Sequence, residues 1–118
     1  MKALLVVAHG SRRDASNDEI RAVAAGLAAA LCDRYQWVEA AFLELAEPSI
    51  PAAIDRAIDA GADEVVLFPY FLSAGRHVFE DIPAIVAERQ AAHPRVDILL
   101  TPYLGQLPGL IELIARAL

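Results

Sequence analysis

The stretch ALLVVAHGSR, residues 3–12, joins an uninterrupted apolar run to a histidine, a glycine, a serine and an arginine. A run of this kind, without polar alternation, is typical of a strand that is covered on both faces, as in a parallel sheet. Ligands of open α/β proteins bind at the carboxyl ends of such strands. We therefore expect a parallel sheet in which the polar residues after the run lie at the functional edge.

Helical and strand patterns alternate along the rest of the chain. Apolar residues recur at helical spacing over residues 17–34, and Ser16 and Glu19 have the spacing of a capping box at the start of that helix. Three further helices are expected: one from Ser49 to Gly61, one that has Asp81 and Pro83 in its first turn and ends at His93, and one over residues 107–118. Strands are expected over residues 3–8, 37–43, 64–70 and 96–100.

This β-α-β-α-β-α-β-α order predicts a three-layer α/β sandwich, in which a four-stranded parallel sheet has helices on both faces. We expect a single domain over residues 1–118. The apolar stripe of each helix is expected to face the core. This includes the last helix, whose stripe consists of Leu107, Leu110, Ile111, Ile114 and Leu118.

Composition and charge exclude several classes of partner. A net charge of -6 without a Lys/Arg cluster argues against nucleic acid. Although 57% of the residues are hydrophobic, no apolar run approaches the roughly 20 residues that a membrane span needs. The N-terminus lacks the pattern of a signal peptide, and the single cysteine, Cys32, cannot form an internal disulfide. We expect a soluble cytoplasmic protein.

Residues that can carry chemistry follow each predicted strand. His9 follows the first strand, Glu44 the second, the loop 73–77 the third and Tyr103 the fourth. A lone histidine after a strand is most often structural, but His9 and His77 at one edge, with a carboxylate nearby, suit Fe²⁺, Co²⁺, Ni²⁺ or Zn²⁺. Glu44 is either a third member of this site or an ordinary turn or cap residue. Two histidines and one glutamate would leave coordination positions open.

Three arginines flank the two histidines although the chain as a whole is acidic. Arg12, Arg13 and Arg76 either bind an anionic substrate through forked hydrogen bonds or are solvated surface charge. Gly10 and Gly75 would let the backbone come close to a ligand. A flat apolar wall beside the site, or ordinary packing, is expected from Phe68, Tyr70, Phe71 and Leu72.

Other sites and enzyme classes find less support in the sequence. The opposite edge of the predicted sheet shows no comparable polar set, and His93, next to Pro94, is expected to be a surface cap of its helix. A GxSxG elbow, a P-loop and a GxGxxG motif are all missing. Ala8 precedes His9 where a phosphatase of the RHG type has arginine.

Three strings together resemble the small, single-domain sirohydrochlorin chelatases, the class II cobalt or iron chelatases of CbiX type. They are LLVVAHGSR, AFLELAEPSIPAAI and VVLFPYFLSAGRHVFEDIP, and the resemblance runs from residue 3 to about residue 105. It implies a chelatase-like fold and insertion of a divalent metal into sirohydrochlorin, without ATP or an organic cofactor. The family favours Co²⁺, with Fe²⁺ second and Ni²⁺ third, in cobalamin or siroheme biosynthesis. Members of this size act as homodimers.

The same resemblance implies roles for individual residues. His9 and His77 match the family's metal-binding pair and would also accept pyrrole protons, and Glu44 matches its glutamate. Phe79 and Glu80 depart from the pattern, since the family often has a basic residue in this stretch. The implied substrate-binding residues are Gly10, Ser11, Arg12, Arg13, Tyr70, Phe71, Leu72, Ser73, Gly75 and Arg76.

Two other functions fit the same sequence features. One is a carrier that binds a metal or a tetrapyrrole at the two histidines without turnover. The other is an enzyme that acts on a different anionic substrate at the same edge without a metal.

Overall fold

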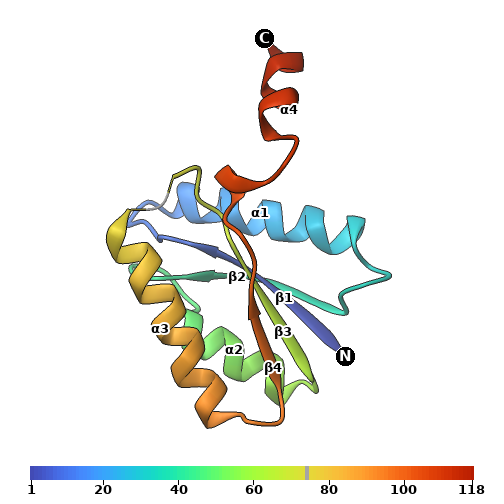
Figure 1. Cartoon of the computed structure of the whole chain (residues 1–118), viewed down its shortest axis with the longest axis vertical. Coiled ribbons are helices and arrows are strands. Elements are labelled where there is room, and N and C mark those ends of the chain that lie inside the picture. The colour runs from blue at the N-terminus through green and yellow to red at the C-terminus, as the bar shows by residue number, and fades with distance from the viewer. Residues whose placement is uncertain (74) are drawn as a thin grey trace.

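The computed structural model describes residues 1–73 and 75–118, without the side chain of His77. Strands and helices alternate along the chain as predicted (Figure 1). The elements are β1 (Lys2–Ala8), α1 (Asp14–Ala30), β2 (Trp37–Phe42), α2 (Ile50–Asp59), β3 (Glu64–Pro69), α3 (Arg76–Ala92), β4 (Asp97–Leu100), a short 3-10 helix (Leu104–Gln106) and α4 (Leu110–Ala117).

The four strands form one parallel sheet in the order β2-β1-β3-β4. Its register aligns Ala3 with Trp37 on one side and with Val65 on the other. From β1 the chain continues to β2, toward one edge of the sheet, and from β3 it continues to β4, toward the other edge. The direction of the connections therefore reverses between β1 and β3. Ligands of open α/β sheets bind at the carboxyl end of such a switch point. The loops after β1 and β3 flank it here.

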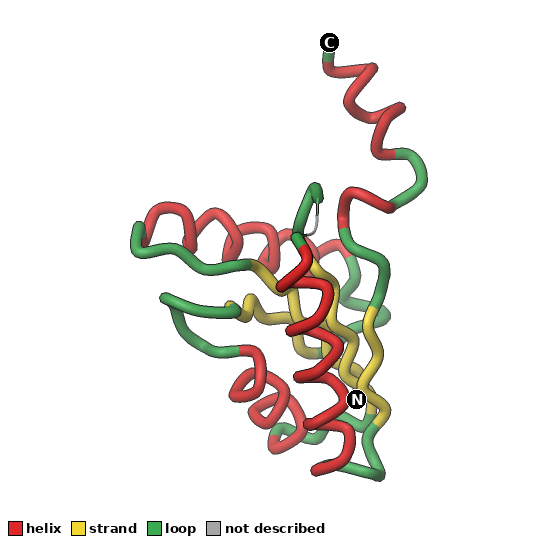
Figure 2. Tube along the Cα trace, turned by 60° about the vertical axis from the view of Figure 1, so that its left-hand side comes forward, coloured by secondary structure: helices red, strands yellow, loops and turns green. Residues whose placement is uncertain are grey.

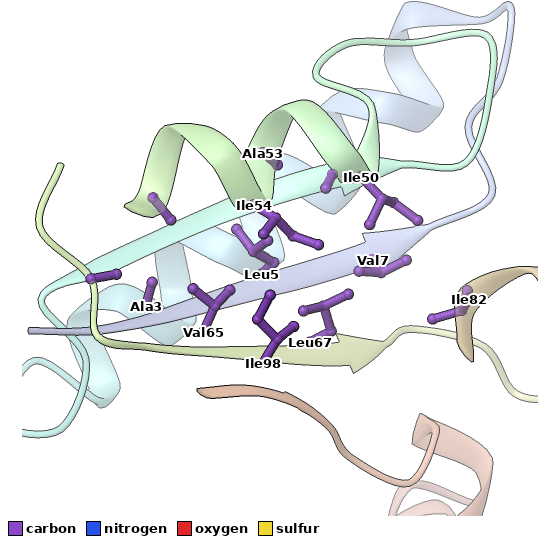
Figure 3. Close-up of a cluster of buried hydrophobic side chains, with 13 residues drawn as sticks. Ala3, Leu5, Val7, Ile50, Ala53, Ile54, Val65, Leu67, Ile82 and Ile98 are labelled. Atoms are coloured by element: carbon purple, nitrogen blue, oxygen red, sulfur yellow. The ribbon is translucent and has the colours of Figure 1, made fainter. Parts of the chain in front are cut away.

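The core lies on both faces of the sheet because the strand side chains alternate. Leu5 and Leu67 face α2 and α3 and are fully buried with Ile54 (Figure 3). Val6 and Phe42 face the other side, where they pack against α1. Burying each such large side chain contributes about 1.5–3 kcal/mol. The three-layer sandwich predicted from the sequence is therefore confirmed.

Two helices begin earlier than predicted. Helix α1 begins at Asp14 and ends at Ala30 rather than spanning residues 17–34, and its first residue follows Arg13, which makes no side-chain cap. The capping box of Ser16 and Glu19 is therefore wrong, because Ser16 already lies inside the helix. Helix α3 begins at Arg76, so the backbone of residues 76 and 77 is helical rather than part of a loop.

The last helix differs most from expectation. Helix α4 projects away from the sandwich instead of packing against it (Figures 1 and 2). The side chains of Ile111 and Leu113 are 72% and 62% exposed. The predicted apolar stripe exists, but it does not face this chain's core, so that prediction is wrong. Among the described helices, each is too short or too polar to cross a membrane.

Candidate functional site

His9 and Glu44 are held side by side by the backbone beyond β1 and β2. The ladder continues for two residues past the strands, since Leu43 N–H donates to Ala8 O and Glu44 N–H to His9 O, both at 3.0 Å. The His9 Nε2 atom then lies 2.9 Å from Glu44 Oε1. Both side chains are more than half exposed. The structure thus brings together two of the three predicted central residues, in a position open to a ligand.

Gly10 is required where these two loops meet. It has φ +96°, and a Cβ atom there would lie 1.7 Å from the Glu44 carbonyl oxygen. That carbonyl also accepts the Ala46 N–H at 2.8 Å, across a tight turn in which Leu45 has φ 64°. A leucine in the left-handed region stores backbone strain. Gly10 is therefore needed for the close approach to the backbone of Glu44, and its approach to a ligand stays a prediction.

Asn17 fixes the loop that carries His9, and the sequence analysis did not single it out. Its side chain is 3% exposed. The Ser11 N–H donates to Asn17 Oδ1 at 3.0 Å, and Asn17 Nδ2 donates to Ser11 O at 2.8 Å. Ser11 Oγ in turn accepts the Arg13 N–H at 3.0 Å. An amide at a buried position of an amphipathic helix is the sequence signal that marks this residue.

An open groove of about 350 Å³ lies beside His9. Tyr70 and Phe71 form part of its wall, and the Tyr70 ring packs edge-on against Phe68, with centroids 6.3 Å apart. Phe71 also lines a smaller, apolar pocket of about 70 Å³ between α3 and the segment after β4, where Phe79 and Tyr103 stack edge to face. Gly10, Ser11 and Asn17 complete the wall near His9. The groove suits a flat ligand with an apolar face.

The other predicted substrate-binding residues do not line the groove. Arg12 and Arg13 are exposed just before α1, and Arg76 is 92% exposed at the start of α3, 3.6 Å from Glu80. Leu72 is 70% exposed, and Ser73 and Gly75 are exposed in the same loop. The three arginine residues are therefore exposed, and none of them lines the groove.

The predicted pair of histidines can be placed only in part. The backbone of His77 lies in the first turn of α3, and its side chain lies outside the described residues. Within the part of the chain that the structure describes, no group of three or more His, Cys, Asp or Glu side chains forms a metal site. His9 and Glu44 supply two donors, so the two-histidine metal site remains a prediction.

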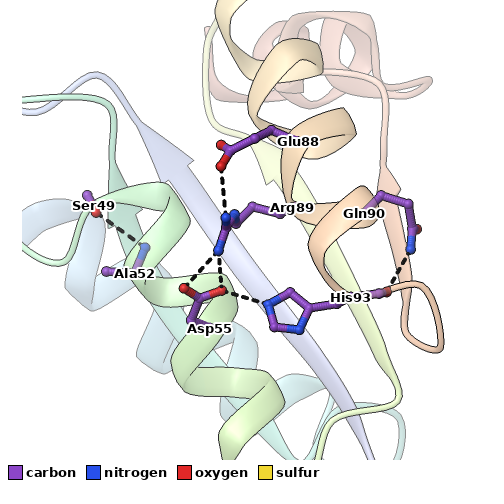
Figure 4. A network of polar contacts seen from close by, with 7 residues as sticks. All are labelled: Ser49, Ala52, Asp55, Glu88, Arg89, Gln90 and His93. Carbon is purple, nitrogen blue, oxygen red and sulfur yellow. Dashed lines mark hydrogen bonds and ion pairs between the residues drawn. The ribbon is translucent and has the colours of Figure 1, made fainter.

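A second histidine–carboxylate pair lies near the opposite edge of the sheet, where the sequence analysis expected no comparable set. His93 Nε2 lies 3.0 Å from Asp55 Oδ1, and both Asp55 oxygens accept from Arg89 Nη1 at 3.0 Å (Figure 4). His93 also ends α3, since its N–H donates to Arg89 O. His93 is the expected cap of α3, and its ring also ties α3 to α2 through Asp55.

These contacts shift the pKa values of Asp55 and Arg89. Partial burial raises the pKa of Asp55, but hydrogen bonds from Arg89 and His93 outweigh it and hold that pKa below its ordinary value. The hydrogen bond from Arg89 to Glu88 raises the pKa of Arg89, and the hydrogen bonds to Asp55 raise it to a smaller extent. Another open hollow of about 430 Å³ at this edge is lined by polar residues such as Lys2, Arg34 and Gln36. The His93 ring is less exposed than that of His9 and its carboxylate partner is also bound by Arg89, so this pair is less open to a ligand.

Comparison with known proteins adds a family assignment to this geometry. The family model CbiX matches residues 3–118. A sirohydrochlorin cobaltochelatase of Methanococcus maripaludis is 42% identical over 86 residues, which cover 73% of this chain and 58% of that protein. The chain thus spans little more than half of this curated relative.

Solved structures of two lengths share the fold. A cobalamin (vitamin B12) biosynthesis CbiX protein from Marinobacter aquaeolei VT8 has a TM-score of 0.78 and 29% identity, over 99% of this chain and 93% of that one. SirB from Bacillus subtilis with Fe3+ has a TM-score of 0.84 and 27% identity, over 98% of this chain but 45% of that one. The fold therefore occurs alone and as part of a chain about twice as long.

Proposed function

Because the chain belongs to the CbiX family, we propose that it inserts a divalent metal ion into sirohydrochlorin without ATP. The observation that carries this proposal is the exposed His9–Glu44 pair, 2.9 Å apart, at the switch point of the sheet and beside an open groove. The similarity to the cobaltochelatase of M. maripaludis supports the reaction class. One chelatase unit formed by residues 1–118 and a cytoplasmic location belong to the same proposal.

His9 and His77 would hold the metal ion and accept protons. Insertion replaces two pyrrole N–H protons with one divalent cation, so two protons must leave the macrocycle. A neutral imidazole can bind a metal or take up a proton near pH 7. Since α3 begins at Arg76, the backbone of His77 lies in the first turn of that helix, which follows β3 across the switch point from β1. Open coordination positions would allow the metal ion to pass to the ring nitrogens.

Glu44 orients His9 in this proposal. Its Oε1, which lies 2.9 Å from His9 Nε2, would accept the Nε2–H of the ring, and this would leave the Nδ1 lone pair for the metal ion. A carboxylate behind a ligating histidine fixes the ring and raises its basicity. Because the Glu44 side chain is also exposed, it can take one of the two released protons. The geometry favours this role over that of a simple turn residue.

The groove would hold the tetrapyrrole. Tyr70 and Phe71 would support the face of the ring, with Gly10 and Ser11 below its edge. Arg12, Arg13 and Arg76 would bind peripheral carboxylates, since all three residues are exposed. Leu72, Ser73 and Gly75 would complete the substrate-binding loop. No organic cofactor is part of the proposed reaction.

Co²⁺ is the proposed metal, with Fe²⁺ second and Ni²⁺ third. The relative from M. maripaludis is named a cobaltochelatase, and SirB structures are described both with Fe3+ and in complex with cobalt. A histidine and carboxylate set accepts several divalent ions, and their intrinsic affinities follow the Irving–Williams order rather than cellular use. Cobalt would place the reaction in cobalamin biosynthesis and iron in siroheme biosynthesis.

The proposal is tested by the visible spectrum of sirohydrochlorin mixed anaerobically with Co²⁺, Fe²⁺ or Ni²⁺. We expect protein at one-hundredth of the substrate concentration to accelerate metallation through many turnovers, and the His9→Ala/His77→Ala double variant not to. A stable protein-bound spectrum with one equivalent and no acceleration would instead indicate a carrier. Equal Co²⁺ binding by wild type and double variant in equilibrium dialysis would contradict the two-histidine site.

A homodimer completes the proposal. The SirB chain is about twice as long as this one and contains a region with the same fold, so two copies of this chain would match its length. Light scattering on the purified protein gives the oligomeric state directly.

A further inference from the structure

Arg21 lies on α1, one helical turn after Asn17, and has no role in the proposed reaction. Its guanidinium group makes three contacts. Nη1 donates to Asp18 Oδ1 at 2.9 Å, Nη2 donates to Glu47 O at 3.1 Å, and Cζ lies 5.2 Å from the centroid of the Phe42 ring. One side chain therefore joins α1 to the end of β2 and to the loop that follows it.

The contacts with Phe42 and Glu47 matter more than the ion pair with Asp18. The side chains of Arg21 and Asp18 are 44% and 69% exposed, and an exposed ion pair contributes little to stability. The Phe42 side chain is instead fully buried, and a guanidinium group within about 6 Å of an aromatic centroid is attracted to the face of the ring. Arg21 thus lies over a fixed support, from which it donates to the Glu47 carbonyl.

The loop that this guanidinium group contacts carries Glu44. We call residues 43–49 the Glu44 turn. Its base is closed by the Phe42 N–H, which donates to Pro48 O at 2.9 Å. Inside the turn, Leu45 has φ 64°, in the left-handed region that costs a leucine free energy. A strained backbone of this kind keeps its conformation only where neighbouring contacts hold it. The bond from α1 supplies such a contact from outside the turn.

Helix α1 therefore contacts both loops that carry the histidine–carboxylate pair. Asn17 bonds the backbone of Ser11, in the loop that carries His9. One helical turn later, Arg21 bonds the backbone of Glu47, in the Glu44 turn. Residues four positions apart lie on the same side of a helix. A single turn of α1 thus spans the two loops, and its rigid geometry fixes their separation.

We propose that Arg21 is a positioning residue, which keeps Glu44 within hydrogen-bond distance of His9. The His9 Nε2 and Glu44 Oε1 atoms lie 2.9 Å apart although both side chains are more than half exposed, so their separation depends on the backbone of the two loops. Arg21 lies outside the described lining of the groove, so it acts through the Glu44 turn. A misplacement of about 1 Å can lower a rate about 100-fold. The effect on rate rests on the proposed metallation reaction, whereas the contacts do not.

The first measurement is amide hydrogen exchange of the full chain, which needs neither metal nor substrate. Glu44 N–H donates to His9 O at 3.0 Å and Ala46 N–H to Glu44 O at 2.8 Å, so these two amides report on the Glu44 turn. Arg21→Met keeps the helix propensity but removes every donor, and it should raise both exchange rates about tenfold. Asp18→Asn is the control, because it removes only the exposed ion pair, and it should leave both rates unchanged.

The second measurement separates positioning from a merely structural role. Arg21→Met should lower kcat for metallation about tenfold and leave KM within about twofold, because a positioned catalytic group is disturbed and no substrate contact is lost. Arg56→Met is the matched control, since it removes an exposed ion pair with Glu39 at 2.8 Å on α2, and it should change neither constant. In a Glu44→Ala background, Arg21→Met should cause no further loss, because the group that it positions is gone.

Three results would overturn the positioning role. Wild-type exchange of both amides in Arg21→Met would show that the Glu44 turn does not depend on this side chain. A raised KM at constant kcat would mean that Arg21 contacts the substrate. An equal loss of kcat with and without Glu44 would mean that it acts by another route. If wild-type protein does not accelerate metallation, the proposed function fails, and the exchange rates alone then decide whether Arg21 holds the turn.

Discussion

The two ends of the sheet each hold a histidine bonded to a carboxylate, at nearly the same distance and in different surroundings. At the carboxyl edge, His9 lies 2.9 Å from Glu44, and their side chains are 59% and 57% exposed. Near the amino edge, His93 lies 3.0 Å from Asp55, with side chains 27% and 41% exposed, and Arg89 binds the same carboxylate. The first pair is free to rearrange around a ligand. The second is occupied in tying α2 to α3.

The backbone conformation and the charged contacts near the two histidine–carboxylate pairs also differ. Near the carboxyl edge, Leu45 adopts a positive φ value, which costs free energy that the rest of the fold must supply. At the amino edge, Arg89 bonds Asp55 and Glu88, although its buried Nε makes no hydrogen bond within the described residues, and the N-terminal amine holds the pKa of Asp63 below its ordinary value. The charged ties between elements thus gather at one end of the sheet, and the exposed His9–Glu44 pair lies at the other.

Substitution of Gly10 should disturb the reactive end most. Gly10→Ala places a Cβ atom against the Glu44 carbonyl at a positive φ, and we expect a loss of about 3 kcal/mol in unfolding free energy together with loss of metallation. Gly26→Ala is the control, because its Cβ meets open space inside α1, and it should stabilise by about 0.5–1 kcal/mol. Urea unfolding measures both. A Gly10→Ala protein with wild-type stability would contradict the close approach.

One buried and one partly buried amide offer a matched test of the two ends. Asn17 bonds the backbone of Ser11, and Gln90 bonds the backbone of His93, Val96 and Ile98 near the amino edge. Asn17→Ala and Gln90→Ala should each cost about 2 kcal/mol of stability, because backbone groups lose their partners. Only Asn17→Ala should also lower the metallation rate, by about tenfold or more. Equal rates in the two folded variants would mean that Asn17 does not position His9.

The pH dependence of stability should come from the amino end. Asp55 has a pKa below its ordinary value of 3.8, so its contribution is present above that value and is lost as the pH falls through the lower, folded value. Asp55→Asn should cost about 1 kcal/mol at pH 7, since the bond to Arg89 loses its charge. The difference between wild type and variant should shrink between pH 4 and pH 2. A constant difference in urea unfolding over this range would exclude Asp55 as its source.

The smallest effect is expected for the exposed arginines. Arg12→Gln should raise KM for sirohydrochlorin several-fold with kcat unchanged, because the guanidinium would contact a peripheral carboxylate in both ground and transition states. Arg34→Gln, at the amino edge, is the matched control and should leave KM unchanged. A fall in kcat at constant KM for Arg12→Gln would assign that side chain to the transition state instead.

The strands and their alternation with helices could be predicted because apolar runs such as residues 3–8 need two covered faces. The position of His9 beside Glu44 followed from parallel strands alone. The starts of α1 and α3 could not be predicted, because Arg13 and Gly75 precede them without a side-chain cap, whereas Ser49 caps α2 as expected. The direction of α4 was missed because periodicity identifies an apolar side but not the element that covers it.

The polar contacts were the least predictable part. The bond between Asp55 and His93 joins residues 38 positions apart, and the role of Asn17 depends on a backbone turn that its sequence does not reveal. Both require the packed structure. The position of the His77 side chain remains a prediction.

The most direct measurement compares His9→Ala with His93→Ala in the anaerobic metallation assay and in urea unfolding. Each substitution removes one ring from one histidine–carboxylate pair. His9→Ala should lower the metallation rate by about 100-fold or more and change the unfolding free energy by about 0.5 kcal/mol or less. His93→Ala should cost about 1 kcal/mol of stability and leave the rate unchanged. A wild-type rate for His9→Ala, or an equal loss of rate in folded His93→Ala, would contradict the assignment of the reaction to the carboxyl edge.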